Sequence, residues 1–401
     1  MIKGNAIVGQ SGGPTSVINA SLAGVVDAAL KCESIESVFG MRYGIEGFLN
    51  EEIIDLGAED KDTLDRLKTT PSSALGSCRL KLQDDHLPKV LELLRKFNIR
   101  YVFLIGGNDT MDTIHRIEAY AQDHDYALTG IGIAKTVDND LFGTDHTPGF
   151  PSAARYIALS VQQAGILARD MQKVDQFVIF QCIGREAGWL VGAAAAGKTS
   201  AADPPHIMCF PERPFERAKF IADVRRCHEN YGFVSIVCGE GITYADETPV
   251  SASDTKDKFG NTEFGAMGGT SAAMALHQII SNEFGFRGEF QVTESLPMCA
   301  ADRAVPLDVE EAYGCGRHAV ALAVEGQTGV MAAMRRGATA EYQCEYVTAP
   351  LGEVAVNAKP MPDEYINQEG NFVTAAFLEY LRPLVGAMPN YAQLSNKRAQ
   401  L

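Results

Sequence analysis

Basic charge is scarce in this sequence, and long hydrophobic runs are missing from it. The chain has 401 residues with 35 lysines and arginines against 51 aspartates and glutamates, a formal net charge of −16. Nucleic acids and anionic membranes are bound through basic surfaces, so this balance argues against both kinds of partner. No segment approaches 18 consecutive apolar residues, and the start MIKGNAIVGQSGG has no signal-peptide core. We therefore expect a soluble cytoplasmic protein.

The cysteines lack any pattern that would hold a metal. Nine are scattered along the chain, with no C-x-x-C pair and no histidine at metal-ligand spacing. This spacing argues against a zinc site and predicts reduced thiols in a cytosolic protein. Internal repeats and low-complexity tracts are also missing.

Short apolar runs alternating with helical patterns fill most of the chain. The runs include NAIVGQ, YVFLIGG, ALTGIGIAK, DQFVIFQCIG and GFVSIVCGEG, and segments such as VINASLAGVVDAALK have the apolar spacing of an amphipathic helix. Strand followed by helix, repeated, predicts parallel sheets with helices on both faces and ligands at the carboxyl ends of the strands. The polar, glycine-rich stretch Ser251 to Thr270 is interpreted as a loop or a crossover between lobes.

Three glycine-rich turns, GQSGGPTSVINA, IGGNDT and CIGREAGW, follow such runs. In the first, Gly12 and Gly13 would let a phosphate approach the backbone at a helix N-terminus. The turn has neither the Lys-Ser/Thr of a P-loop nor the G-x-G-x-x-G of a dinucleotide site. Any one such turn is more often simple strand-to-helix punctuation, whereas three together favour an anion site.

The segment AKTVDNDLFGTDHT carries the densest chemistry. Asp138 and Asp140 could hold a divalent metal, or one of them could be a general base, while Lys135 could neutralise a phosphoryl group. A helix-capping loop rich in Asp and Asn explains the spacing equally well. Arg79, Arg185 and Arg303 lie beside glycines or in loops and could bind phosphate, although most arginines are solvated surface groups.

Taken in order, these segments resemble the 6-phosphofructokinases over most of the chain. The pairing of GGNDT with KTVDND resembles the pyrophosphate-dependent branch, in which Asp109 and Lys135 replace two glycines of the ATP-dependent branch. Asp109 would fill the room for the rest of ATP and repel its third phosphate, at a cost of several kcal/mol in a partly desolvated site. The resemblance thus implies pyrophosphate as donor and a sugar phosphate, fructose 6-phosphate, as acceptor.

The resemblance also assigns roles to single residues. Asp138 would be the general base toward the sugar's 1-hydroxyl, with Lys135 stabilising the transferred group. The remaining implied assignments are these: diphosphate binding by Gly12, Gly13, Arg79, Asp109 and Lys135; substrate binding by Thr136, Asp138, Asp140, Arg185, Glu212 and Arg303; Mg²⁺ binding by Asn108 and Asp109, helped by Asp140.

Two positions depart from the family pattern. Asn108 stands where most relatives have an aspartate that organises the metal, and an amide oxygen brings less charge. Pro297 and Met298 stand where the family has a Gln-Arg pair whose arginine binds the sugar's 6-phosphate. Losing that arginine could cost roughly 2 to 4 kcal/mol, with Arg303 as a possible substitute. An acceptor such as sedoheptulose 7-phosphate, or a catalytically weak regulatory paralogue, are therefore the alternatives.

For the whole chain the resemblance implies an α/β protein with two Rossmann-like lobes and the active site in the cleft between them. We expect a donor lobe from residues 1–149 plus about 255–305, and a sugar-phosphate lobe from 150–254 plus about 306–401 with a C-terminal helical extension. Shared sites in the family imply a homodimer or homotetramer. The NAD and lipid kinases also use a Gly-Gly-Asp turn, but they lack the KTVDND segment.

Overall fold

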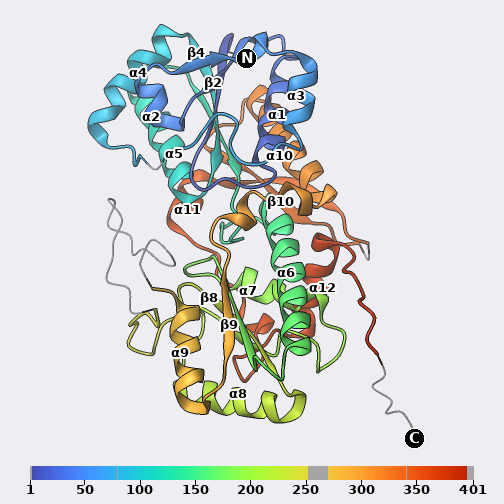
Figure 1. Ribbon diagram of the computed structural model, residues 1–401. Helices are drawn as coiled ribbons and strands as arrows, with labels where there is room; N and C mark the ends of the chain where they lie inside the picture. Colours follow the sequence, from blue (N-terminus) through green and yellow to red (C-terminus); the bar gives the residue numbers. More distant parts are fainter. Residues whose placement is uncertain (1, 79, 252–269, 340, 395–401) are drawn as a thin grey trace, which may run out of the picture.

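Two α/β lobes make up the protein, which we describe from a computed structural model covering residues 2–78, 80–251, 270–339 and 341–394. Each lobe has one sheet with helices on both faces (Figure 1). The predicted fold class, two lobes with mainly parallel sheets, is confirmed. No helix in these ranges is long and apolar enough to span a bilayer.

The first lobe is built on a seven-stranded sheet with the order β11-β10-β5-β4-β1-β2-β3. The five central strands are parallel, whereas the edge strands β3 and β11 are antiparallel to their neighbours. Its strands are β1 (Gly4–Gln10), β2 (Ile35–Met41), β3 (Ile53–Asp55), β4 (Ile99–Gly106), β5 (Thr129–Ala134), β10 (Val330–Arg336) and β11 (Cys344–Pro350). Its helices are α1 (Ile18–Ala29), α2 (Gly44–Leu49), α3 (Lys61–Leu67), α4 (Leu87–Lys96), α5 (Asn108–Asp123), α10 (Pro306–Val324) and α11 (Leu351–Val356).

The second lobe has a four-stranded parallel sheet with the order β7-β8-β6-β9. Its strands are β6 (Phe177–Cys182), β7 (Ile207–Cys209), β8 (Val234–Gly239) and β9 (Gly288–Val292). Its helices are α6 (Phe150–Asp170), α7 (Trp189–Ala193), α8 (Arg217–Tyr231), α9 (Ala272–Phe284) and α12 (Ala375–Val385). Helices α6, α7 and α12 share one core, and α8 and α9 cover the other face of the sheet.

Strand β4 shows why the parallel strands are continuous apolar runs. Tyr101, Phe103 and Ile105 pack into the core formed with α1 and α10, while Val102 and Leu104 pack into the core formed with α4 and α5. Because successive side chains of a strand point to opposite faces, a strand covered on both sides needs apolar residues at every position.

The predicted lobe boundaries are wrong after residue 254. Strand β9 pairs with β6, so α9 and β9 belong to the second lobe. Helix α10 packs on α1, and β10 pairs with β5, so residues 306–356 complete the first sheet. The chain then returns to the second lobe and ends in α12, which packs on α6. Composition marked no linker at these crossings, because each segment is built like the lobe it joins. Most of the predicted loop from Ser251 to Thr270 lies outside the described residues.

Candidate active site

Three neighbouring parallel strands of the first lobe end at two of the glycine turns and at the segment AKTVDNDLFGTDHT. Strands β1, β4 and β5 are hydrogen-bonded side by side, and they lead into Gly12, Asn108 and Lys135 respectively. Since parallel strands end at the same edge of a sheet, the three predicted segments are brought together there.

The first turn presents bare backbone beside a buried ammonium group. Gly12 has a φ of 76°, and a Cβ there would lie 3.3 Å from Nζ of Lys135. Nζ of Lys135 donates a hydrogen bond of 2.7 Å to the carbonyl of Gly13, and Ser77 Oγ donates to the carbonyl of Gly12. The turn is therefore fixed from two sides, with no side chain of its own between its backbone and an incoming anion.

Lys135 is only 4% exposed. Burial lowers its pKa to about 8, although the nearby carboxylates of Asp138 and Asp140 favour the charged form. At neutral pH the group therefore still carries a positive charge in a water-poor place, where its field on a bound phosphoryl group is strong.

Asp138 has the features expected of a general base. Its Oδ1 is buried without a hydrogen-bond partner. Burial, together with the negative charges of Asp140 and Glu240, raises the pKa of Asp138 to about 7. Its backbone N–H donates to Oγ1 of Thr136. This bond fixes the start of the turn of residues 138–145, which we call the acidic turn. A carboxylate that exchanges its proton near neutral pH and has an unsatisfied oxygen is suited to proton transfer.

Asn108 and Asp109 open helix α5 but face different surroundings. Nδ2 of Asn108 donates to the carbonyls of Val354 and Asn357, at 2.9 and 2.8 Å. Asp109 is 81% exposed at its side chain and lies 3.5 Å from Nζ of Lys81. The prediction that Asp109 lies in a partly desolvated site is therefore wrong, because its carboxylate, in the first turn of α5, is exposed to solvent. Its repulsion of a phosphate across solvent is closer to 1 kcal/mol than to several.

The second lobe contributes residues from the ends of β6, β7 and β8. Arg185 follows β6, and its positive charge acts on Asp138 and Glu240, favouring the charged form of both. Glu240 follows β8, and its Oε1 accepts a hydrogen bond from the N–H of Gly184. Gly184, to which Glu240 is bonded, lies beside the proposed base, because a Cβ at Gly184 would be 3.7 Å from Oδ1 of Asp138.

Glu212 is tied to backbone on two sides. Its Oε1 accepts from the N–H groups of Gly188 and Met361, at 2.8 and 3.1 Å. Its Oε2 is buried without a partner, and burial raises the pKa of the carboxyl group. One oxygen therefore holds loops together, while the other is unsatisfied.

The region of the missing Gln-Arg pair contacts the glycine turn. A Cβ at Gly13 would lie 3.3 Å from Sδ of Met298, so this thioether sits over the turn. Arg303, the possible substitute, donates from Nη1 to Oγ of Ser160 at 2.6 Å and stacks on the ring of Tyr156. Its guanidinium group is thus engaged with helix α6. Arg79 lies outside the described residues.

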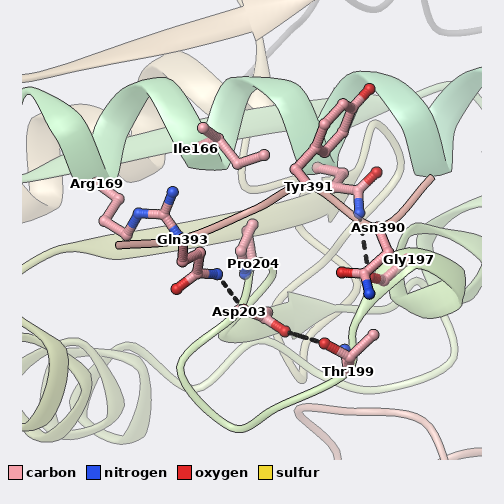
Figure 2. A pocket seen from close by; sticks show the side chains of 10 residues that line it. Ile166, Arg169, Gly197, Thr199, Asp203, Pro204, Asn390, Tyr391 and Gln393 are labelled. Atoms are coloured by element: carbon pink, nitrogen blue, oxygen red, sulfur yellow. Dashed lines mark hydrogen bonds between the residues drawn. The ribbon is translucent and has the colours of Figure 1, made fainter. Parts of the chain in front are cut away.

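Two pockets elsewhere in the molecule are not part of this site. One, of about 30 Å³, lies beside α6 and is shown in Figure 2, where Gln393 bonds to Asp203. The other, of about 660 Å³, lies near the starts of β4 and β5, at the opposite edge of the first sheet. The first is large enough for about one water molecule.

Sequence reasoning missed Lys359. Its ammonium group bonds to the acidic turn and its backbone to Asp140 and Trp189. It stands in the polar stretch NAKPMPDE, without a glycine turn or an apolar run beside it, so no local signal could have found it.

The chain is similar to known proteins over its whole length. The sequence profile described as phosphofructokinase matches residues 5–323. The pyrophosphate–fructose 6-phosphate 1-phosphotransferase of Halomonas elongata is 36% identical over 416 aligned residues, covering 100% of this chain and 98% of that protein. The pyrophosphate-dependent phosphofructokinase structure from Marinobacter aquaeolei has a TM-score of 0.86 and 35% identity, covering 100% of this chain and 99% of that one. A sulfofructose kinase of Alkalicoccus urumqiensis is 30% identical over 383 residues, covering 95% of this chain and 96% of that protein.

Proposed function

The chain belongs to the phosphofructokinase family, and from this premise we propose that it transfers a phosphoryl group from pyrophosphate to the 1-hydroxyl of fructose 6-phosphate. The product would be fructose 1,6-bisphosphate, as in glycolysis, with transfer in both directions. One observation carries the proposal: a buried carboxylate with an unsatisfied oxygen, Asp138, lies beside a buried ammonium group, Lys135, that is bonded to a glycine turn. The names of the relatives support the choice of donor and acceptor.

In the proposed reaction Asp138 takes the proton of the sugar's 1-hydroxyl as that oxygen bonds to phosphorus. The bridging P–O bond of pyrophosphate breaks, and its electron pair leaves with inorganic phosphate. Lys135 stabilises the negative charge on the transferred group, while the N–H groups of the Gly12–Gly13 turn bind the diphosphate. Thr136, Asp140, Arg185 and Glu212 are proposed to bind the substrates.

We propose Mg²⁺ as the cofactor, with Asp109 as its carboxylate ligand and the oxygen of Asn108 beside it. Among the described residues there is no cluster of three or more His, Cys, Asp or Glu side chains suited to a metal. The residues present still fit Mg²⁺, which keeps several waters and is held by one or two protein oxygens together with substrate phosphates. Asn108 gives its amide protons to two carbonyls, which leaves only its oxygen for a cation. Bound there, the ion would neutralise phosphate charge.

A second acceptor is favoured by the end of the site nearest the sugar's 6-position. By the family resemblance Met298 replaces the arginine that binds the 6-phosphate, so it brings no charge to that phosphate, and Arg303 is engaged with α6. Sedoheptulose 7-phosphate, another sugar phosphate, or the sulfofructose named for one relative would each change that end of the acceptor while keeping the donor.

The deciding experiment is a coupled assay with Mg²⁺ that combines each of two donors, pyrophosphate and ATP, with each of three acceptors, fructose 6-phosphate, sedoheptulose 7-phosphate and sulfofructose. We expect turnover with pyrophosphate and fructose 6-phosphate, little with ATP, and none in an Asp138→Ala control. Turnover with only one of the other acceptors would replace the proposed acceptor. No turnover with any pair would favour a regulatory paralogue. Sedimentation velocity on the same sample would test the proposed homodimer or homotetramer.

A further inference from the structure

One short segment connects several parts of the candidate site. We call Asn357–Met361, which follows α11 on its way back to the second lobe, the return segment. At one end the carbonyl of Asn357 accepts a hydrogen bond from Asn108, at the start of α5. At the other end the N–H of Met361 donates to Glu212. The return segment therefore contacts both the predicted metal end and the predicted sugar end of the site.

The middle of the return segment is bonded to the acidic turn. Ala358 forms an isolated antiparallel bridge with Leu141. The backbone N–H of Lys359 donates to the carbonyl of Asp140 at 2.7 Å. These contacts pair the return segment with the chain just after the proposed base.

The side chain of Lys359 reaches into the same turn. Its Nζ lies 2.8 Å from the carbonyl oxygen of Asp145, 3.0 Å from that of Thr144 and 3.4 Å from Oδ1 of Asn139. A lysine has three N–H donors, and here each has an acceptor from residues 139–145. The ammonium group is thus the centre around which this turn is folded.

Asn139 is the link from that centre to the two carboxylates. It is fully buried and has a φ of 58°, a left-handed conformation that costs free energy for a residue with a Cβ. Besides Lys359, its side chain bonds to the hydroxyl of Tyr380 and the N–H of Thr147. Because Asp138 and Asp140 flank Asn139, its backbone conformation sets where both carboxylates point.

We propose that Lys359 is a positioning residue for phosphoryl transfer, which holds the turn of residues 139–145 so that Asp138 and Asp140 keep the arrangement the reaction needs. This inference rests on the proposed function. The competing explanation is that Lys359 only stabilises the fold, as a buried, hydrogen-bonded lysine does anywhere.

A matched control for that explanation exists in the second lobe. Lys198 lies between Gly197 and Thr199, two residues that line the small pocket in Figure 2. Its Nζ also donates to three backbone carbonyls, those of Ala201, Asp203 and Pro205. Its ammonium group lies 5.6 Å from the ring centroid of Phe372, just as that of Lys359 lies 5.0 Å from the ring centroid of Trp189. Lys359 holds a turn that begins next to the proposed base, whereas the turn that Lys198 holds is not part of the candidate site.

The chain also provides a spectroscopic reporter at the right place. Trp189 is its only tryptophan. Its indole N–H donates to the carbonyl of Lys359 at 3.2 Å, beneath the same ammonium group. Tryptophan emission therefore reports on the position of the return segment without any turnover.

The experiment compares wild type, Lys359→Met and Lys198→Met by steady-state kinetics, thermal unfolding and tryptophan emission. We expect Lys359→Met to lower kcat about 100-fold, the loss typical of a small displacement of reacting groups, with both KM values changed less than about threefold. Its emission maximum should shift. Lys198→Met should show a similar change in melting temperature, wild-type emission and a kcat within about threefold of wild type.

Wild-type turnover separates this inference from the proposed function. A wild type without turnover refutes the proposed function and this inference with it. An active wild type with Lys359→Met at a kcat within threefold of it, or with Lys198→Met losing as much, refutes the positioning role alone. If Lys359→Met does not fold, Lys359→Arg takes its place under the same criteria, because it keeps the charge but cannot place three donors in the same directions.

Discussion

Replacing Lys135 with methionine should separate stability from activity. In the fold the pKa of Lys135 falls from 10.5 to about 8 through burial, which corresponds to about 3 kcal/mol of unfavourable free energy for the charged form. Methionine removes that cost at similar volume, but it leaves the carbonyl of Gly13 without its donor, a loss of about 1–3 kcal/mol. The two changes nearly cancel, so the melting temperature of Lys135→Met should stay within about 3 °C of wild type.

Activity should respond very differently. The ammonium group lies at the diphosphate turn, and removing one preorganised charge from a transition state typically costs about 100- to 1,000-fold in kcat. The same change removes a charge that favours the ionised form of Asp138. The assay is kcat/KM for pyrophosphate alongside thermal unfolding, with Lys31→Met as the control, because Lys31 is an exposed lysine that is paired with Asp27 far from the site. A kcat/KM within tenfold of wild type, or a melting temperature more than 10 °C lower, would refute the reasoning.

Three further outcomes are expected. Glu240→Gln should move the acid limb of the pH–rate profile to lower pH, because the charge of Glu240 adds to burial and to Asp140 in raising the pKa of Asp138; an unmoved or raised limb contradicts this. Asn108→Asp should lower the free energy of unfolding by about 1–3 kcal/mol in urea titrations, because a carboxylate would then face two backbone carbonyls; an unchanged midpoint would show that these bonds contribute nothing. Asp109→Gly should raise the ratio of kcat/KM for ATP to kcat/KM for pyrophosphate by only about fivefold to tenfold, because the carboxylate is 81% exposed; a thousandfold change in that ratio would mean that the site closes around it.

The fold class could be predicted from the sequence because the apolar pattern of each strand is a local signal. Runs such as YVFLIGG are apolar at every position, which only a strand covered on both faces requires, and the structure places this one at the centre of the first sheet. Lobe membership after residue 254 was not readable, because pairing of β10 with β5 and of β9 with β6 is a contact between distant parts of the chain. The sequence of β9 or of β10 alone does not determine which strand it pairs with.

In the site, too, features with a local sequence signal could be predicted, whereas contacts between distant residues could not. The glycine turns and the KTVDND segment stand at strand ends, so the sequence could predict that Gly12, Lys135 and Asp138 meet. Exposure of Asp109 depends on how the first turn of α5 is rotated, and Lys359 reaches the acidic turn across more than 200 residues of chain. The exposure of Asp109 and the contact made by Lys359 both result from tertiary packing, which cannot be predicted from local sequence patterns.

The interleaving of the two lobes bears on how this chain is made in the cell. During synthesis the first sheet cannot be completed until β10 and β11, which end at Pro350, have left the ribosome. Before then, β5 is an open edge that lacks the neighbour that later covers it, although the second lobe's sheet is already fully synthesised by Val292. Domains normally fold in the order in which they emerge. Here the lobe that starts first completes its sheet only after the other lobe has completed its own, so the edge of β5 stays unpaired from the synthesis of β5 at Thr129–Ala134 until that of β10 at Val330–Arg336.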